Sequence, residues 1–322
     1  MTISTEVSWK LDGITMFGTI TKPRGEGPFP GVVLVAGSGP TDRDWNSPLL
    51  PGTNGSARLI AEALAETGYA TLRYDKRASG PHVRENLPAM VGRISMQSHL
   101  DELVAAVEQF ATDSDVDAAR LAGLGSSEGC LHVLHYATSE QAHPFSALVL
   151  TGAPGRSIGT VLVTQLSQQL AGSPELVPLV EQAAARYAAG EPIAPDPGLR
   201  EQVRMVFASF ETPANLPFAR ELWTEDATQS LPRVTIPTLV VIGGKDVQID
   251  VHADGAPLQE AATGMANVAF TFPVDANHVL KHEPHTREEV LAGRGTPYND
   301  DSAELDPEAM ADILEWLGET LG

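Results

Sequence analysis

One serine in the chain stands in a pattern suited to nucleophilic chemistry. The stretch Gly125–Gly129, with the sequence GSSEG, follows an apolar run at 120–124 and precedes a helical pattern that begins at Cys130. A G-x-S-x-G sequence between a strand and a helix holds the serine hydroxyl on a sharp turn above a sheet. The small residues around the serine let strand and helix approach closely around a strained backbone. We therefore predict that Ser127 is a nucleophile.

A second stretch, Gly155–Gly159, fits the same pattern. Its serine, Ser157, lies several residues beyond the strand expected at 145–150, after a Gly-Ala-Pro sequence. This setting is typical of a loop that opens an amphipathic helix. Chemistry at Ser157 would also leave only one further strand before the acid that the reaction needs. The strand directly before Ser127 and the helix directly after it favour Ser127.

A serine hydroxyl needs a base to take its proton and an acid to orient that base. Asp246 follows the apolar run 238–242 and a Gly-Gly-Lys sequence, and His278 follows the last expected strand, 268–272. The order Ser, Asp, His is the one that elbow-type sheets have. We therefore predict that His278 is the base and Asp246 its orienting acid. Asp250 is a weaker alternative because it lies further from the strand end.

The attack of a serine on a carbonyl also needs donors for the oxyanion, and backbone N–H groups suffice. One such group is the N–H of Glu128, the residue after the nucleophile. The other lies in the turn 37–39, and we assign it to Ser38. The Glu128 side chain is expected to cap the helix or to pair with Arg43 or Lys76, which is a structural role.

Strands and helices that alternate along the chain predict the elements that position these groups. Val7–Leu11 and Ile14–Thr21 flank an Asp-Gly pair, which is a hairpin signal. The continuous apolar run 31–36 is typical of a central strand buried on both faces. Ser56, and either Ser95 or Ser98, are the expected N-caps of the helices that follow. The pattern as a whole predicts an α/β fold with a mostly parallel sheet flanked by helices.

Between about Gly152 and Arg233 the pattern predicts helices without strands. We expect an inserted helical cap at 153–233, on a core formed by 1–152 and 234–322. The cap is expected to cover an apolar pocket. The side chains expected to contribute to it are Leu162, Leu166, Phe207, Phe210 and Trp223. Arg43, in the loop after the turn 37–39, is a further candidate for a substrate contact.

Composition excludes several classes of partner. A net charge of −21 argues against nucleic acids and against anionic membrane surfaces, because their phosphates would be repelled. No apolar run approaches the length of a membrane span, and the N-terminus does not resemble a signal peptide, so we expect a cytoplasmic protein. A small-molecule substrate is expected, and a homodimer is compatible with the sequence.

The histidines and the single cysteine suggest no further chemistry. Cys130 is expected to be a buried structural thiol, and one cysteine cannot form an intrachain disulfide. Two groups of histidines lie close in sequence, at 278–285 and at 132–135, but no carboxylate or thiolate cluster completes a metal pattern. We therefore expect no metal and no cofactor.

The chain resembles the α/β-hydrolase superfamily, and within it the bacterial serine hydrolases of esterase, acyl-hydrolase and prolyl-oligopeptidase-like type. The segments that carry the resemblance are Ala36–Asp44, Leu72–Arg77, Gly125–Gly129, Gly244–Asp246 and Ala276–Lys281. They span nearly the whole chain. The sequence differs at Ala36 and Ser126, where many relatives have histidine.

The residues and the resemblance together predict a metal-independent serine carboxylesterase. Ser127 would form an acyl-enzyme that water releases. A thioesterase and a peptidase or amidase are the alternatives that use the same groups, and a catalytically silent binding protein on the same scaffold is the alternative from another class. Epoxide hydrolase and dehalogenase chemistry is disfavoured, because both need an aspartate in place of Ser127.

Overall fold

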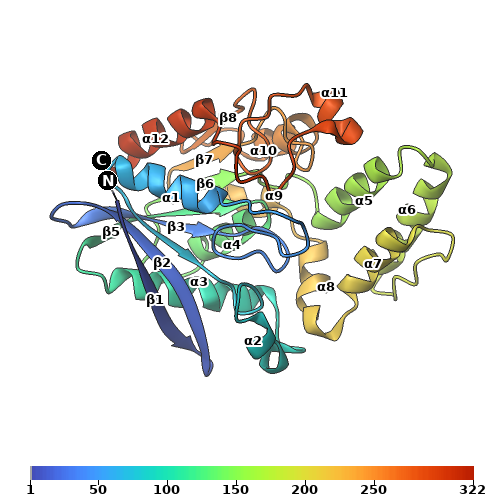
Figure 1. Cartoon of the computed structure of the whole chain (residues 1–322), viewed down its shortest axis with the longest axis horizontal. Coiled ribbons are helices and arrows are strands. Elements are labelled where there is room, and N and C mark those ends of the chain that lie inside the picture. The colour runs from blue at the N-terminus through green and yellow to red at the C-terminus, as the bar shows by residue number, and fades with distance from the viewer. Residues whose placement is uncertain (1) are drawn as a thin grey trace.

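One sheet organises the protein (Figure 1), and residues 2–322 are described by a computed structural model. Within these residues the sheet has eight strands in the order β1-β2-β4-β3-β5-β6-β7-β8. β1 pairs antiparallel with β2, and β2 pairs antiparallel with β4. The other neighbouring strands are parallel. The predicted mostly parallel sheet with flanking helices is therefore confirmed.

The strands are β1 (Thr2–Leu11), β2 (Ile14–Pro23), β3 (Phe29–Val35), β4 (Ala70–Tyr74), β5 (Val116–Ser126), β6 (Ala147–Thr151), β7 (Thr238–Val241) and β8 (Val268–Thr271). The helices are α1 (Ser56–Glu66), α2 (Val83–Met90), α3 (Met96–Ala111), α4 (Glu128–Ala137), α5 (Ile158–Gln169), α6 (Val177–Ala188), α7 (Glu201–Phe210), α8 (Phe218–Trp223), α9 (Ala227–Ser230), α10 (Ala256–Ala261), α11 (Arg287–Glu289) and α12 (Pro307–Leu321). Short helical turns are η1 (Pro174–Leu176), η2 (Pro213–Asn215), η3 (Leu231–Arg233), η4 (Val251–Gly255) and η5 (Val290–Arg294).

Helices cover the sheet on both faces. Successive side chains of a strand point to opposite faces, and β3 shows what each face meets. Val33 and Val35 pack in the apolar cluster that holds side chains of α3 and α4. Val32 and Leu34 pack in the cluster that holds side chains of α1 and α12. All four side chains are buried, as the continuous apolar run predicts.

The segment between β6 and β7 is helical, and its described residues contain no strand. In Figure 1, α5, α6 and α7 stand apart from the sheet on one side of the molecule. They have an apolar cluster of their own, in which Val180, Tyr187 and Phe207 are buried. The division of the chain into a core and a cap at 153 and 233 remains a prediction about domains.

One local prediction needs correction, and one helix was not predicted. α1 begins at Ser56 itself, because Gly55 takes the N-cap position with φ at +68°, which suits glycine. The helix α2 has no counterpart among the predicted elements, and Pro88 lies inside it, a residue that usually interrupts a helix. Of the two serines proposed to cap α3, Ser95 is the cap and Ser98 completes a capping box with it.

Candidate active site

Ser127 lies on the turn between β5 and α4. Its backbone has φ 55° and ψ −121°, a strained conformation for a residue with a side chain. The turn is held from both directions. The Ser127 N–H donates to the Thr151 carbonyl oxygen at 2.8 Å, and the Cys130 N–H donates to the Ser127 carbonyl oxygen at 2.9 Å. The end of the neighbouring strand β6 therefore helps to hold the strained serine.

The two glycines of the GSSEG stretch lie where a side chain would collide with backbone. A Cβ atom added at Gly125 would lie 2.5 Å from the Gly129 carbonyl oxygen. One added at Gly129 would lie 2.4 Å from the Val35 carbonyl oxygen. Both distances are shorter than a carbon–oxygen contact allows, so glycine is required for α4 to start this close to β3 and β5.

The second serine with the same sequence pattern has a different setting. Ser157 is the N-cap of α5, with φ −56° and ψ 145°, and its hydroxyl accepts the Thr160 N–H. This is an unstrained capping conformation. The structure thus places Ser157 at a helix start and Ser127 on a strand-to-helix turn.

His278 and Asp246 meet in a buried hydrogen bond. His278 Nδ1 lies 2.7 Å from Asp246 Oδ2. The other carboxylate oxygen, Oδ1, accepts the N–H groups of Gln248 at 2.8 Å and Ile249 at 2.9 Å. Burial by itself lowers the pKa of His278, but the adjacent Asp246 carboxylate outweighs burial and the pKa is raised above its ordinary value. The carboxylate is thus fixed in place and stabilises a positive charge on the ring.

The alternative acid, Asp250, lies elsewhere in the same loop. Its Oδ1 caps η4 by accepting the N–H groups of His252 and Ala253. Its Oδ2 pairs with Arg287. The structure brings Asp246, and not Asp250, to the His278 ring.

Gly152 is a site residue that the sequence pattern did not single out. It lies at the end of β6 with φ +59°. A Cβ atom added there would lie 3.2 Å from His278 Cε1 and 3.4 Å from Asp246 Oδ2. The absence of a side chain therefore makes room for both groups. A Gly after a buried strand is a signal that could have identified it.

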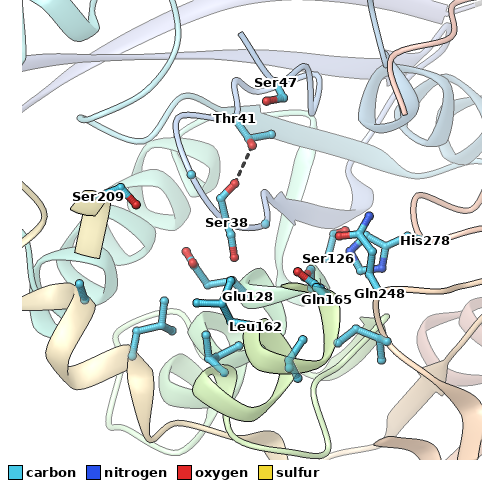
Figure 2. A pocket seen from close by; sticks show the side chains of 18 of the residues that line it. Ser38, Thr41, Ser47, Ser126, Glu128, Leu162, Gln165, Ser209, Gln248 and His278 are labelled. Carbon is cyan, nitrogen blue, oxygen red and sulfur yellow. Dashed lines mark hydrogen bonds between the residues drawn. The ribbon is translucent and has the colours of Figure 1, made fainter. Parts of the chain in front are cut away.

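The turn after β3 passes beside the nucleophile. A Cβ atom added at Gly37 would lie 3.2 Å from Ser127 Cβ. The Ser38 carbonyl oxygen accepts the Thr41 hydroxyl at 2.8 Å, as Figure 2 shows. The Gly37 carbonyl oxygen accepts a hydrogen bond from Lys76 Nζ at 2.7 Å. The peptide groups on both sides of Ser38 are thus held by the buried side chains of Lys76 and Thr41.

A cavity of about 520 Å³ brings these groups together. Ser127 and His278 both line it, although no hydrogen bond of residues 2–322 joins the Ser127 hydroxyl to the His278 ring. Such contacts are often loose before substrate binds. Ser38 and Glu128 line the same cavity (Figure 2). The sheet side and the helical segment 158–222 each supply part of its wall.

Two of the six side chains predicted for the pocket lie at the cavity, and the other four do not. Leu162 and Phe210 line the cavity. Leu166, Phe207 and Trp223 lie instead in the apolar cluster within the helical segment, so their periodicity reflects packing among α5, α6 and α7. The cavity wall also includes polar and apolar residues that were not predicted: Thr41, Trp45, Ile158, Val161, Gln165, Ser209, Phe218, Leu222, Gln248 and Tyr298.

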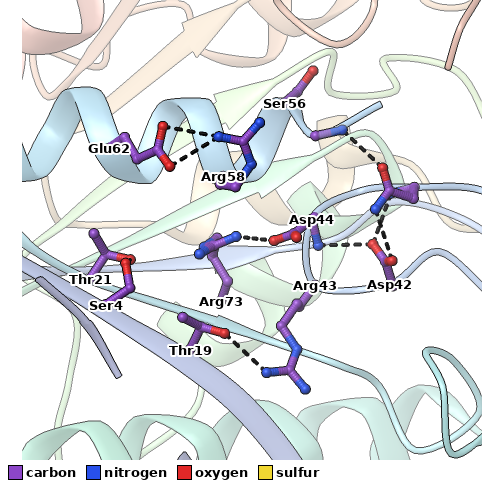
Figure 3. Close-up of polar contacts among 12 residues, drawn as sticks. Ser4, Thr19, Thr21, Asp42, Arg43, Asp44, Ser56, Arg58, Glu62 and Arg73 are labelled. Atoms are coloured by element: carbon purple, nitrogen blue, oxygen red, sulfur yellow. Dashed lines mark hydrogen bonds and ion pairs between the residues drawn. The ribbon is translucent and has the colours of Figure 1, made fainter. Parts of the chain in front are cut away.

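Arg43, the sixth predicted pocket residue, belongs to an ion network beside the cavity. Its guanidinium pairs with Asp75 at 2.7 Å and with Glu6 at 2.5 Å. Figure 3 shows its further hydrogen bond to Thr19 and the neighbouring pair of Arg73 with Asp44. Arg43 braces the loop after β3, and it is absent from the cavity wall formed by the described residues.

The Glu128 side chain pairs with Lys76, one of the two partners that the sequence offered. Glu128 Oε1 lies 3.6 Å from Lys76 Nζ and 3.2 Å from His132 Nε2. All three side chains are buried. The Cys130 thiol is also buried, and burial raises its pKa. Cys130 is therefore held as an inert thiol beneath the turn.

Two further features of the described chain bear on function. Histidine, cysteine and acidic side chains of residues 2–322 form no group of three that could hold a metal ion. Over the same residues, no helix combines the length and the apolar character that crossing a bilayer requires.

Comparison with known proteins places the chain among hydrolases. The family model described as "Serine aminopeptidase, S33" matches residues 53–284. The chain is 29% identical over 267 residues to the esterase EstD of Thermotoga maritima, a match that covers 82% of this chain and 57% of that protein. The chain therefore spans little more than half the length of this relative.

Solved structures share the fold at low sequence identity. An esterase of Pyrococcus furiosus is 16% identical with a TM-score of 0.58, covering 100% of this chain and 92% of that one. A proline iminopeptidase of Mycobacterium smegmatis is 15% identical with a TM-score of 0.56, covering 98% of each chain. Identities this low bear on the fold alone.

Proposed function

The chain belongs to the serine aminopeptidase S33 family of α/β hydrolases, and on this premise we propose that it is a serine hydrolase that cleaves carboxylic esters. The observation that carries the proposal is the strained Ser127 at the wall of a cavity that His278 also lines, with Asp246 at 2.7 Å from the His278 ring. A serine, a base and an oriented acid are the parts that acyl transfer to serine requires.

In the proposed reaction, Ser127 Oγ attacks the ester carbonyl carbon while His278 Nε2 takes its proton. Asp246 accepts the Nδ1–H, which leaves Nε2 free to act as the base. The N–H groups of Ser38 and Glu128 hold the carbonyl oxygen as it becomes negative. His278 then gives its proton to the alcohol that leaves. Water, activated by the same histidine, releases the acid from Ser127.

The cavity favours an uncharged ester over an aminoacyl substrate. An aminopeptidase needs a carboxylate to hold the free ammonium group of its substrate. Among the described residues, the carboxylate in the cavity wall is that of Glu128, and Lys76 and His132 already occupy it. Apolar side chains such as Leu162 and Phe218 supply much of the remaining wall. The similarity to a protein named as an esterase supports the same choice.

A panel of substrates tests this proposal. The wild-type protein and Ser127→Ala are assayed with p-nitrophenyl esters, acyl-CoA thioesters and aminoacyl anilides. We expect turnover of neutral esters, and a loss on the order of 10³-fold or more in Ser127→Ala. Preferred turnover of thioesters or anilides would overturn the ester assignment. Turnover of none of the three classes by a folded wild-type protein would favour a binding protein.

A further inference from the structure

The Ser38 N–H belongs to a peptide group whose other end is held by Lys76. That peptide joins Gly37 to Ser38, and its carbonyl oxygen accepts from Lys76 Nζ at 2.7 Å. It is a trans peptide, since the cis bonds of the described chain lie elsewhere. In a trans peptide the C=O and N–H bonds point in opposite directions. An ammonium group fixed on the carbonyl therefore sets the direction of the N–H.

The same lysine is fixed by the residue that carries the second donor. Lys76 Nζ lies 3.6 Å from Glu128 Oε1, and the two side chains are 5% and 1% exposed. The backbone N–H of Glu128 is the other group assigned to the oxyanion. Lys76, which follows β4, thus links the loop after β3 to the start of α4, through its hydrogen bond to Gly37 and its ion pair with Glu128. It ties together the peptide units of both donors.

The Lys76–Glu128 pair also balances the negative charge of the Glu128 carboxylate. A carboxylate in the cavity wall would repel the oxyanion that forms at Ser127. Burial alone would raise the pKa of Glu128, but Lys76 and His132 outweigh it, so the pKa is lowered and Glu128 is ionised. Burial lowers the pKa of His132 to about 4, so this ring is neutral at pH 7 and its Nε2–H donates to Glu128. Lys76 is therefore the cation that balances the carboxylate.

We propose that Lys76 is a positioning residue of the oxyanion hole: it aims the Ser38 N–H and neutralises Glu128 beside the developing oxyanion. This inference rests on the proposed serine hydrolase function. It assigns Lys76 and the Glu128 carboxylate a role in transition-state binding, where the sequence predicts a structural pair only.

The decisive variant is Lys76→Met, which keeps the length of the side chain and removes its charge. We expect kcat for a neutral ester to fall about 100-fold, the size of effect seen when one oxyanion donor is lost, with KM nearly unchanged. Affinity for a boronic acid that forms a tetrahedral adduct on Ser127 should fall in parallel. Lys76→Arg keeps the charge and a donor, and should retain most of kcat.

A second change separates geometry from charge. Lys76→Met leaves the Glu128 carboxylate buried and unbalanced, so adding Glu128→Gln, which keeps the backbone donor, should raise kcat about tenfold above the single variant. Lys22→Met is the matched control. Lys22 pairs with Asp113 and Asp115 at 2.9 and 2.8 Å. The preceding residue, Thr21, pairs with Thr71 near the start of β4, so Lys22 lies at the end of the strands opposite the site. Its kcat should match the wild type.

Unfolding midpoints show which variants fold. If Lys76→Met does not fold, Lys76→Gln replaces it, with the same parallel loss in kcat and boronic acid affinity expected. A folded Lys76→Met or Lys76→Gln variant that keeps wild-type kcat and boronic acid affinity would overturn the inference, as would equal losses in kcat and in substrate binding. These results differ from failure of the proposed function, in which the wild-type protein itself neither hydrolyses esters nor binds the boronic acid.

Discussion

Replacing Asp246 with asparagine tests how the carboxylate controls the His278 ring. In the wild type, Oδ1 accepts two backbone N–H groups, from Gln248 and Ile249, and Oδ2 lies 2.7 Å from His278 Nδ1. The asparagine oxygen must take the Oδ1 place, because an amide nitrogen there would face two donors. Its NH₂ group then faces His278 Nδ1, to which it can only donate.

The consequence is the wrong tautomer of the base. With Nδ1 accepting, the ring proton moves to Nε2, the atom that has to take the proton of Ser127. A triad disabled in this way loses about 10⁴-fold in kcat, which corresponds to about 5.4 kcal/mol of transition-state stabilisation. Steady-state hydrolysis of a p-nitrophenyl ester measures it. We expect KM to change little, because Asp246 lies behind the ring and is buried.

Asp250→Asn is the matched control for this experiment. Asp250 lies four residues further along the same loop and also accepts two backbone N–H groups, but it pairs with Arg287. Its variant should keep kcat within about twofold of wild type. If Asp246→Asn kept more than a tenth of wild-type kcat, or if Asp250→Asn suffered the larger loss, the assignment of the acid would be refuted.

Three further predictions concern other parts of the structure. The Asp246 carboxylate outweighs burial and raises the pKa of His278 above its ordinary value of 6.5. Because the base must be neutral, kcat/KM should fall as the pH drops through this raised pKa. A fall in kcat/KM with its midpoint below pH 6.5 would contradict this. Arg77→Met removes the guanidinium that lies 2.9 Å from the buried Glu102, and it should lower the free energy of unfolding in urea by about 3–5 kcal/mol. Adding Glu102→Gln should restore part of this loss. No recovery in the double variant would argue against an unpaired charge as the cause. Phe207→Ala, in the apolar cluster of α5–α7, should lower the free energy of unfolding by about 3–5 kcal/mol. It should also speed amide hydrogen exchange in α5–α7 more than in β3 and β5. Equal acceleration in both regions would show that the helical segment does not open on its own.

The sheet could be predicted from the sequence because its central strands are unusual segments. The run 31–36 is continuously apolar, which few elements other than a strand buried on both faces explain, and β3 lies there. The relative order of Ser127, Asp246 and His278 could also be read, since each follows a predicted strand. The helix α2 could not, because it contains Pro88, a residue that usually interrupts a helix.

The pocket could be predicted only in part, because helical spacing shows that a face is buried and not what it meets. Phe207 and Phe210 lie on one face of α7, yet Phe207 packs within the helical cluster and Phe210 lines the cavity. Long-range ion pairs have the same limit. The sequence offered Arg43 and Lys76 equally as partners for Glu128, and only the path of the loop after β3 decides between them.

Covalent labelling shows directly whether Ser127 is the nucleophile. The native protein is treated with a fluorophosphonate, digested, and the modified peptide is sequenced by mass spectrometry. We expect one adduct, on Ser127, which is lost in Ser127→Ala and forms much more slowly in His278→Ala. An adduct on Ser157 that persists in Ser127→Ala, or no adduct on the folded wild-type protein, would contradict it.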